Sequence, residues 1–493
     1  AQLVSALPSS GYNPFMGEPP LLNQRPTYAR LGVLAFICSL SMLTYLDRIC
    51  IMQVQDNIQT DLRISKVQMG FVFSAFLIGY ALFEVPGGWM GDRWGSRRVL
   101  IRIVLWWSFF TALTGSADQI AHWLFGSSVR RFNAYFGWGW DSAVLTVWLA
   151  LGALITVRFL FGCGEAGAYP NMTRIVGAWF PFRERGLAQG GIWFSARIGG
   201  AIAPFVIVQL AALAGWRAAF WVLGFVGIFW CVFFWMLFRN TPEEDPRCNE
   251  AERDLIRSGP YSLQAHEAGL AHGATPWRKF LSSGTVRAMC VAAIGVNFGW
   301  YFYPTWQPLY FEEVYETSFD KSAIIVGLPF LCGAFGCLLG GRVSDQLIQW
   351  TGSRRWGRSL NGIVGFVGAG LCVLATGFVT AQWQAVVLLC LAFFINDIAI
   401  PPIWAVASDI GGKYAGTLSG FMNMMGGIGA IASPIVVSIL LDKFLNFLEP
   451  MLKWRIAFTM LACSWFIAAL AWLWIDATKR LDQDEEPAAP ISS

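Results

Sequence analysis

Charged residues are scarce in this chain. Only 13% of its 493 residues are Asp, Glu, Lys or Arg, whereas 56% are hydrophobic, and soluble domains carry about 25% charged residues. A soluble protein this apolar would need an impossibly large core, so we expect its surface to face lipid. The net charge of +4 is small and dispersed, which argues against a nucleic-acid partner. The shortage of charge therefore predicts a membrane protein.

Patterns typical of metal sites are also missing. The chain has three histidines and eleven scattered cysteines, without a CxxC pair and without the Cys/His spacing of a zinc or haem site. Many of the cysteines lie inside apolar runs, where a reduced thiol behaves as a small hydrophobic side chain. We therefore expect no bound metal and no organic cofactor.

Enzyme motifs are missing as well. The sequence contains no nucleophile–base constellation and no phosphate-binding glycine loop, so we do not expect an enzyme. No soluble signalling domain of adequate size is evident, which leaves a membrane-embedded sensor as a remote alternative. The first thirty residues are polar and proline-rich, and the apolar run after them is long enough to be an uncleaved spanning helix rather than a signal peptide.

Twelve apolar runs approach the length of about 20 residues that a helix needs to cross a bilayer. The runs are 31–52, 67–90, 99–121, 142–168, 186–212, 217–238, 288–311, 322–341, 360–381, 384–409, 414–442 and 453–475. They predict an all-α membrane protein with two pseudo-symmetric six-helix bundles. The expected units are an N-terminal tail (1–30), an N-terminal bundle (31–238), a linker loop (239–287), a C-terminal bundle (288–475) and a C-terminal tail (476–493).

Positive charge in the loops predicts the orientation. With both termini inside, 23 of the 35 Lys and Arg residues fall on the inner side, 9 on the outer side and 3 within spans. Because positive loops stay in the cytoplasm during insertion, we expect both termini to be cytoplasmic in a plasma or bacterial inner membrane.

The two halves of the sequence repeat each other. The segment from Gly186 aligns without gaps with the segment from Gly416, and WRAAF at Trp216 recurs as WRIAF at Trp454. Related halves are typical of alternating-access transporters, whose substrate site lies near the midplane between them. The glycines of these segments also let helices approach closely.

The loop between the second and third spans, GWMGDRWGSRR from Gly88, resembles the signature loop of the major facilitator superfamily. A weaker copy, GRVSD, ends at Asp345. We expect the aspartate to cap a neighbouring helix and the arginines to bind carboxylates across the bundle interface, so that the loop latches one conformation. The predicted latch residues are Gly88, Asp92, Arg93, Gly95, Arg97, Arg98 and Asp345.

Three further segments narrow the resemblance. TYLDR at Thr44, RFLFGCGEAGAYPNMTRIVGAWFPFRERG from Arg158 and YFYPTWQPLY from Tyr301 resemble the anion:cation symporter family, over roughly residues 30–475. That family includes bacterial galactonate, glucarate and hexuronate transporters, sialin and the vesicular glutamate transporters. The resemblance implies symport of an organic anion with H⁺, with Na⁺ as the other candidate coupling ion.

Ionisable residues inside spans are costly and usually functional. Arg158 and Glu165 are seven residues apart, so they share a helix face about 10 Å from each other, too far for a direct pair. The resemblance implies that Arg158 contacts the anion and that Glu165 carries a proton. It likewise implies a second proton site at Asp47 and a second substrate guanidinium at Arg48. A purely structural ion-pair network is the alternative for all four.

Other residues near the expected cavity are less specific. The resemblance points to Tyr45, Tyr80, Trp404 and Asn423 as residues lining the substrate site. Arg197 departs from the galactonate transporter, which has a glutamine there; it either favours a dicarboxylate or neutralises a buried acid such as Glu165 or Asp397. Asp397 is correspondingly either a third proton carrier or the partner of Arg197. For Glu84 we favour a structural hydrogen bond.

The sequence thus predicts a monomeric transporter, working by alternating access, that carries an organic anion, most simply a hexonate, hexuronate or aldarate, together with protons. An anion exchanger or organophosphate antiporter of the same fold is the alternative. One feature is left without a function: the aromatic loop after the third span, with Arg130 and Arg131, is typical of a helix lying in the outer membrane interface.

Overall fold

The computed structural model describes residues 25–136, 141–257, 275–317 and 319–481, and in these ranges the secondary structure is helical throughout, with no strand. Within the described ranges, nine helical stretches are long and apolar enough to cross a membrane, or ten if the bent pair α4 and α5 forms one span. One of these stretches, Gln382–Ile439, contains two helices, α17 and α18. All twelve spans predicted from the sequence fall on helices, which agrees with a twelve-span, two-bundle architecture.

The first half of the chain forms what we call the N bundle. Its helices are α1 (Ala29–Gln53), α2 (Gln55–Leu62), α3 (Lys66–Trp94), α4 (Ser96–Thr114), α5 (Ala117–Phe136), α6 (Ser142–Glu165), α7 (Ala168–Trp179), α8 (Arg185–Ala214) and α9 (Trp216–Leu237). Within it, α1 packs on α8, α3 on α6 and α4 on α9.

The second half forms the C bundle. Its helices are α13 (Gly284–Trp300), α14 (Phe302–Tyr315), α15 (Phe319–Thr351), α16 (Arg354–Thr376), α17 (Gln382–Gly411), α18 (Ala415–Ile439) and α19 (Pro450–Ala471). The short helices α10 (Glu250–Arg257) and α12 (Trp277–Ser282) lie between the two halves of the sequence. Within the C bundle, α15 and α16 both pack on α17, and α13 packs on α18 and α19.

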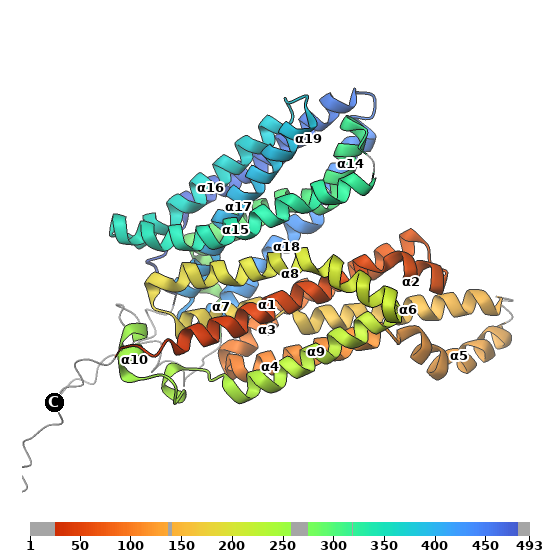
Figure 1. Cartoon of the computed structure of the whole chain (residues 1–493), viewed down its shortest axis with the longest axis horizontal. Helices are drawn as coiled ribbons and strands as arrows, with labels where there is room; N and C mark the ends of the chain where they lie inside the picture. Colours follow the sequence, from red (N-terminus) through yellow and green to blue (C-terminus); the bar gives the residue numbers. More distant parts are fainter. Residues whose placement is uncertain (1–24, 137–140, 258–274, 318, 482–493) are drawn as a thin grey trace, which may run out of the picture.

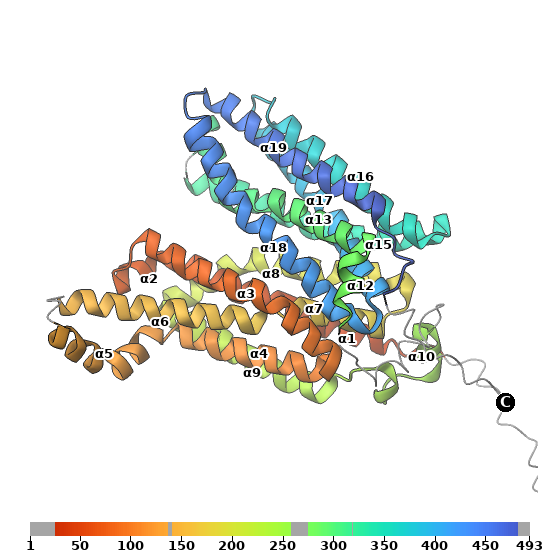
Figure 2. The ribbon, with the colours of Figure 1, turned by 180° about the vertical axis from the view of Figure 1, so that it is seen from behind.

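The bundles lie close together at one end of the molecule and diverge toward the other (Figures 1 and 2). We call the close end, where α10 lies, the α10 end; α2, α5 and α14 lie at the opposite end. Two helix pairs, α8 with α15 and α3 with α18, make the main contacts between the bundles.

Glycines make these cross-bundle contacts possible. A side chain at Gly88 would overlap the carbonyl oxygen of Gly416, and one at Gly341 would overlap that of Gly186. These positions belong to the repeated segments of the sequence, so the same device recurs in both halves. Because glycine has no Cβ, the backbones of two spanning helices can approach this closely.

Two predicted spans differ from the structure. The third was expected to run to residue 121, but α4 ends at Thr114 and the chain bends by 72° before α5 begins. Gly115 lies at the bend, where a Cβ would be 2.8 Å from the carbonyl oxygen of Arg217. The seventh span is divided into α13 and α14 at Tyr301. Apolar periodicity does not reveal such breaks, because the residues on both sides remain apolar.

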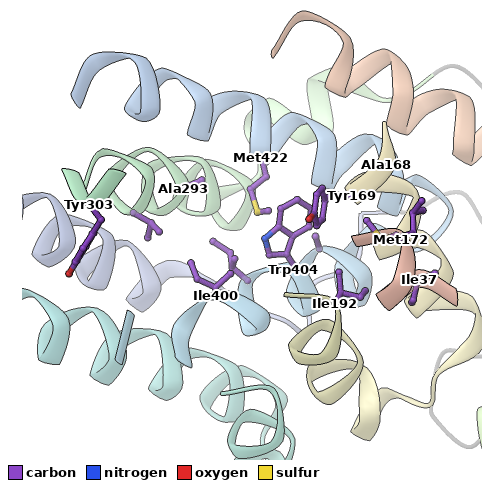
Figure 3. Packing of buried hydrophobic residues seen from close by; sticks show 14 of the residues in the cluster. Ile37, Ala168, Tyr169, Met172, Ile192, Ala293, Tyr303, Ile400, Trp404 and Met422 are labelled. Carbon is purple, nitrogen blue, oxygen red and sulfur yellow. The ribbon is translucent and has the colours of Figure 1, made fainter. Parts of the chain in front are cut away.

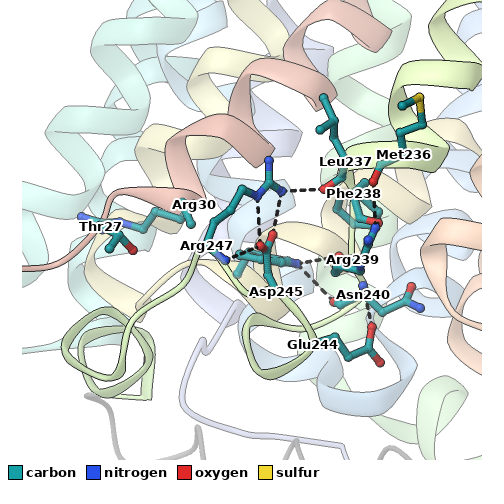
Figure 4. A network of polar contacts seen from close by, with 12 residues as sticks. Thr27, Arg30, Met236, Leu237, Phe238, Arg239, Asn240, Glu244, Asp245 and Arg247 are labelled. Carbon is teal, nitrogen blue, oxygen red and sulfur yellow. Dashed lines mark hydrogen bonds and ion pairs between the residues drawn. The ribbon is translucent and has the colours of Figure 1, made fainter.

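The segment after α9 is more ordered than a simple linker. Arg247 forms an ion pair with Asp245 at 2.7 Å and donates a hydrogen bond to the carbonyl oxygen of Leu237, at the end of α9 (Figure 4). In α10, Glu252 accepts hydrogen bonds from the backbone N–H groups of Ala29 and Arg30, at the start of α1. The segment therefore ties the end of α9 to the beginning of α1.

Candidate functional site

Arg48 and Glu165 form an ion pair inside the N bundle. The Nε of Arg48 on α1 lies 2.6 Å from Oε1 of Glu165, the last residue of α6. Glu165 is fully buried, whereas 21% of the Arg48 side chain is exposed. Within the part of the chain that the structure describes, Nη2 of Arg48 and Oε2 of Glu165 have no hydrogen-bond partner. Each member of the pair thus keeps one side available.

Aromatic rings surround the Arg48 guanidinium. Its Cζ atom lies 4.4 Å from the centroid of the Tyr80 ring, and three more rings lie within 6 Å: Tyr45, Phe76 and Tyr169. Cation–π contacts of this kind stabilise a guanidinium without using its N–H groups. Arg48 therefore stays charged in an apolar setting and retains hydrogen-bonding capacity.

Arg158 is buried without an ion pair among the residues that the structure describes. Its Cζ lies 4.3 Å from the Phe161 ring and 5.1 Å from the Phe76 ring, and its Nε has no hydrogen-bond partner there. As the seven-residue spacing predicted, Arg158 and Glu165 do not form a direct salt bridge. A buried guanidinium without a counter-ion is costly unless an anion joins it.

Asp47 is the second buried acid of this cluster, close enough to interact electrostatically with both Arg158 and Glu165. It is 3% exposed, and its Oδ1 has no hydrogen-bond partner in the described ranges. We call Asp47, Arg48, Arg158 and Glu165 the midplane cluster. The structure thus brings together the four residues of the strongest sequence prediction, and leaves both donors and acceptors among them unused.

Arg197 and Asp397 form an ion pair that joins the two bundles. Nε and Nη2 of Arg197 on α8 lie 2.7 and 3.2 Å from the two carboxylate oxygens of Asp397 on α17. Nη1 of Arg197 donates to the hydroxyl of Tyr45 at 3.1 Å, and Asn396 donates to Asp397 at 2.9 Å. Of the two partners proposed for Arg197 from the sequence, the structure selects Asp397.

Glu84 and Asn423 make a second connection between the bundles. The amide of Asn423 on α18 donates a short hydrogen bond to Oε1 of Glu84 on α3. Glu84 is buried, and Asn423 is partly exposed. In this conformation Asn423 is thus engaged with a carboxylate of the other bundle.

Trp404 lies where the bundles meet (Figure 3). Its ring centroid is 6.1 Å from that of Tyr169 and 5.4 Å from that of Trp193, and the latter two rings stack at 4.8 Å. The Trp404 side chain is 3% exposed. Its surroundings in this conformation are aromatic, so it closes the site rather than lining an open part of it.

At the α10 end, Asp92 binds the first turn of α18. Its carboxylate accepts hydrogen bonds from the backbone N–H groups of Gly416 and Thr417, at 2.9 and 2.6 Å, and from the Thr417 hydroxyl at 2.6 Å. Arg174 lies 3.5 Å from the same carboxylate. A carboxylate at a helix N-terminus satisfies unpaired N–H groups and the helix dipole.

Asp345 makes the equivalent contact from the other bundle. It accepts hydrogen bonds from the backbone N–H groups of Gly186 and Leu187 in the first turn of α8, at 3.1 and 2.7 Å. Arg358 binds Asp345 at 2.7 Å and Asp409 at 3.3 Å, and Arg185 reaches Asp409 from the N bundle at 3.1 Å. We call these contacts, with those of Asp92, the α10-end latch.

The arginines of the signature loop do not take part in the α10-end latch, although the sequence predicted that they would. Arg93 and Arg98 are exposed, and Arg97 donates to the backbone carbonyl of Trp235 within the N bundle. Gly95 has a φ of 82° and lies against Asn240. None of the three arginines pairs with a carboxylate of the other bundle in the described ranges. Among the described residues, the arginines that do so are Arg185, which pairs with Asp409, and Arg197, which pairs with Asp397. Arg174 contacts Asp92 within the N bundle. Arg174 and Arg185 both lie inside the quoted segment from Arg158 but were not singled out there.

Other functional candidates had no signal in the sequence. Tyr169 and Trp193 were not recognised because aromatic residues in a bundle are usually packing residues, and Arg358 and Asp409 lie near helix ends, where charges are common. In the aromatic segment that forms α5, Trp123 and Tyr135 are 83% and 85% exposed and Arg131 is exposed; the side chain of Arg130 lies outside the described part of the structure.

The profile of the Major Facilitator Superfamily matches residues 37–434. The probable sulfoacetate transporter SauU of Cupriavidus necator is 32% identical over 463 residues, which cover 93% of this chain and 96% of that protein. The probable galactarate/D-glucarate transporter GudP of Escherichia coli strain K12 is 30% identical over 423 residues, covering 84% and 87% of the two chains.

Among solved structures, the proton:xylose symporter XylE matches 92% of this chain and 99% of its own, with a TM-score of 0.66 and 16% identity. At this identity the match supports the fold alone. Together with the helices long enough to cross a membrane, the matches settle the class of protein. The chain belongs to the Major Facilitator Superfamily and is a multi-pass membrane transporter, not an enzyme.

Proposed function

We propose that this transporter carries an organic anion into the cell together with protons. The observation on which this rests most directly is the Arg48–Glu165 pair: a guanidinium among aromatic rings whose Nε binds a buried carboxylate, and whose buried Nη2 has no hydrogen-bond partner in the described ranges. An unused N–H of a guanidinium is complementary to a carboxylate or sulfonate oxygen. The relatives named for sulfoacetate and for galactarate or D-glucarate support an organic acid as the substrate.

In this mechanism, protonation of Glu165 controls how strongly the protein binds the anion. When Glu165 takes a proton, its charge no longer holds Arg48, and the guanidinium is available to the substrate. Arg158, which lacks an ion pair in the described structure, adds a second positive charge, and Asp47 is a second acceptor for a proton. Loaded with both anion and proton, the cluster has few unpaired charges, and the bundles can rock.

The charges of the loops support an orientation in the membrane and, with it, a conformational state. We propose that both termini face the cytoplasm, so that the α10 end is the inner end and the structure is closed on that side. The arrangement of Figure 1, with the bundles diverging at the opposite end, then corresponds to an outward-facing state. We further propose that the protein works as a monomer in a plasma or bacterial inner membrane, with residues 31–238 and 288–475 as its two moving units.

Transport by proteoliposomes tests the proposal. With glucarate or sulfoacetate outside, the wild type should make the external buffer more alkaline as it takes up substrate. Glu165→Gln, which imitates the protonated acid, should abolish uphill accumulation while counterflow exchange continues. An external pH that does not change during uptake, together with accumulation that Glu165→Gln does not alter, would contradict proton coupling and indicate an anion exchanger.

A further inference from the structure

The Arg197–Asp397 pair is a second buried charge site, apart from the midplane cluster. Its two side chains are 4% and 0% exposed, and they come from α8 of the N bundle and α17 of the C bundle. On α15, a side chain at Gly333 would overlap Oδ2 of Asp397. The glycine thus leaves room for the carboxylate.

Hydrogen-bond donors without acceptors lie next to this pair. The Cζ atom of Arg197 is 5.7 Å from the Trp193 ring and 5.1 Å from the Trp300 ring. Both indole N–H groups are buried and have no acceptor within the described ranges, and the same holds for Nη2 of Arg48. Buried donors left without acceptors are costly, and oxygens of an anion would satisfy them.

Tyr45 connects the two guanidiniums. Its hydroxyl accepts a hydrogen bond from Arg197, and the centroid of its ring lies 5.7 Å from Cζ of Arg48. A molecule that contacts Arg48 and extends past Tyr45 would therefore reach Arg197. There it would meet a guanidinium already occupied by an internal carboxylate.

Resting on the proposed function, we propose that the transporter selects organic dianions, and that the second anionic group of the substrate displaces Asp397 from Arg197. Asp397 holds the guanidinium in a bidentate arrangement, which is the geometry that a substrate carboxylate would take over. The exchange also removes an ion pair between α8 and α17, so it loosens a connection between the bundles. A monoanion bound at Arg48 leaves that connection in place.

Once it is displaced from Arg197, the carboxylate of Asp397 no longer has a positive partner to neutralise its charge. The titratable and charged groups facing it are Arg197 from α8, the Cys337 thiol from α15 and the Tyr303 hydroxyl from α14, with Asn396 beside it on α17. Once Arg197 binds the substrate, none of the others supplies positive charge. Asp397 therefore takes a proton from the outer solution, and a dianion enters with one more proton than a monoanion.

A matched pair of substrates tests this inference. Glucarate and gluconate share a six-carbon skeleton and differ in one terminal group, a carboxylate in glucarate and a hydroxymethyl in gluconate. Initial uptake and protons taken up per substrate would be measured in proteoliposomes with the full-length wild type and with the double variant Arg197→Gln/Asp397→Asn. Changing both partners avoids leaving one buried charge unpaired.

The wild type should favour glucarate by about tenfold or more, and the double variant should lose this preference, because its uptake of glucarate falls to the level of gluconate. The additional proton per glucarate should disappear as well. Arg185→Gln/Asp409→Asn is the matched control, because it removes another ion pair between the bundles and should slow both substrates alike.

Four outcomes would overturn the inference. A double variant that retains the preference for glucarate would show that Arg197 does not bind the second anionic group of the substrate. Equal loss of both substrates, as expected for the control, would make the pair a structural lock. Wild-type uptake of both substrates at the same rate and proton ratio would contradict the inference but leave proton-coupled anion transport standing, whereas no uptake of either would count against both proposals.

Discussion

At the α10 end, Asp92 and Asp345 each accept two backbone N–H groups from the first turn of a helix in the opposite bundle. In the midplane cluster, Arg48, Arg158, Asp47 and Glu165 each keep a buried polar atom without a partner in the described ranges. Both regions place charges inside a membrane protein. The groups of the α10-end latch satisfy one another, whereas those of the midplane cluster need a bound anion and protons to be satisfied.

This difference separates two uses of buried charge. A satisfied network holds one conformation, because its hydrogen bonds and ion pairs between the bundles would be lost if the bundles separated. An incomplete network binds, because its unused donors gain a partner only when a ligand arrives. The two regions should therefore respond differently to substitution: the midplane cluster in binding and transport, the latch in the balance between conformations.

Among single substitutions, the largest effect is expected from Arg48→Lys. Lysine keeps the charge but presents one ammonium instead of a planar guanidinium, so it loses the arrangement in which one side binds Glu165 and the other the substrate. We expect initial uptake of glucarate to fall by about 100-fold. The thermal stability of the purified protein without substrate should change little. A large loss of stability with normal uptake would show that Arg48 stabilises the fold and does not bind the substrate.

The next largest effect is expected from Gly341→Val. The valine side chain would overlap the carbonyl oxygen of Gly186, so the α10 end could no longer close. Spin labels introduced as unnatural amino acids at the exposed positions Trp94 and Trp350 would report the separation of the bundles. The label distance should increase in the variant and stay unchanged in Gly32→Ala, where a Cβ meets no atom within 4 Å.

The symmetry of these contacts was predictable in part. The gapless repeat from Gly186 and Gly416, and the two copies of the signature around Asp92 and Asp345, predicted equivalent helix contacts in the two halves. The structure shows them as two carboxylates, each binding the first turn of a helix that begins a repeated segment. A repeat in sequence carries this information because duplicated halves preserve their packing.

Other features were not predictable from the sequence. The partners of Arg48 and Arg197 depend on helices far apart in the chain, and a sequence shows only which face of one helix a residue occupies. Arg197 accordingly had two equal interpretations until the structure placed it against Asp397. The bend between α4 and α5 was also missed, because both helices are apolar and the turn depends on Gly115 meeting Arg217.

A smaller effect is expected from Asp345→Asn and Asp92→Asn. Each replacement keeps the size of the side chain but weakens hydrogen bonds to a charged acceptor, which are worth about 1.5–3 kcal/mol each. We expect the closed α10 end to lose about 1–2 kcal/mol relative to the open one, seen as a second population in the Trp94–Trp350 label distance. Asp56→Asn, at an exposed position of α2, should leave a single population.

The smallest effect is expected from Glu252→Gln, outside both regions. Burial alone raises the pKa of Glu252, but hydrogen bonds from Thr27, Ala29 and Arg30 outweigh it and lower the pKa below its usual value. A carboxylate with a lowered folded-state pKa stabilises the protein above its unfolded pKa of about 4.3, and this contribution is lost as the pH falls through the folded value.

We therefore expect Glu252→Gln to destabilise the protein by about 1 kcal/mol at pH 7 and progressively less below about pH 4. Thermal unfolding in detergent over this pH range would measure it, with the exposed Glu250→Gln as the control. A difference between wild type and Glu252→Gln that is independent of pH would show that the charge of Glu252 does not hold α10 to α1.

Uptake by vesicles containing Arg48→Gln/Arg158→Gln tests the central claim most directly. We propose that these two guanidiniums bind the anion. The initial rate of glucarate or sulfoacetate uptake should therefore fall by about 1,000-fold or more in the double variant. Arg287→Gln, at an exposed position, should transport as the wild type does. Uptake by the double variant at the wild-type rate would contradict the account.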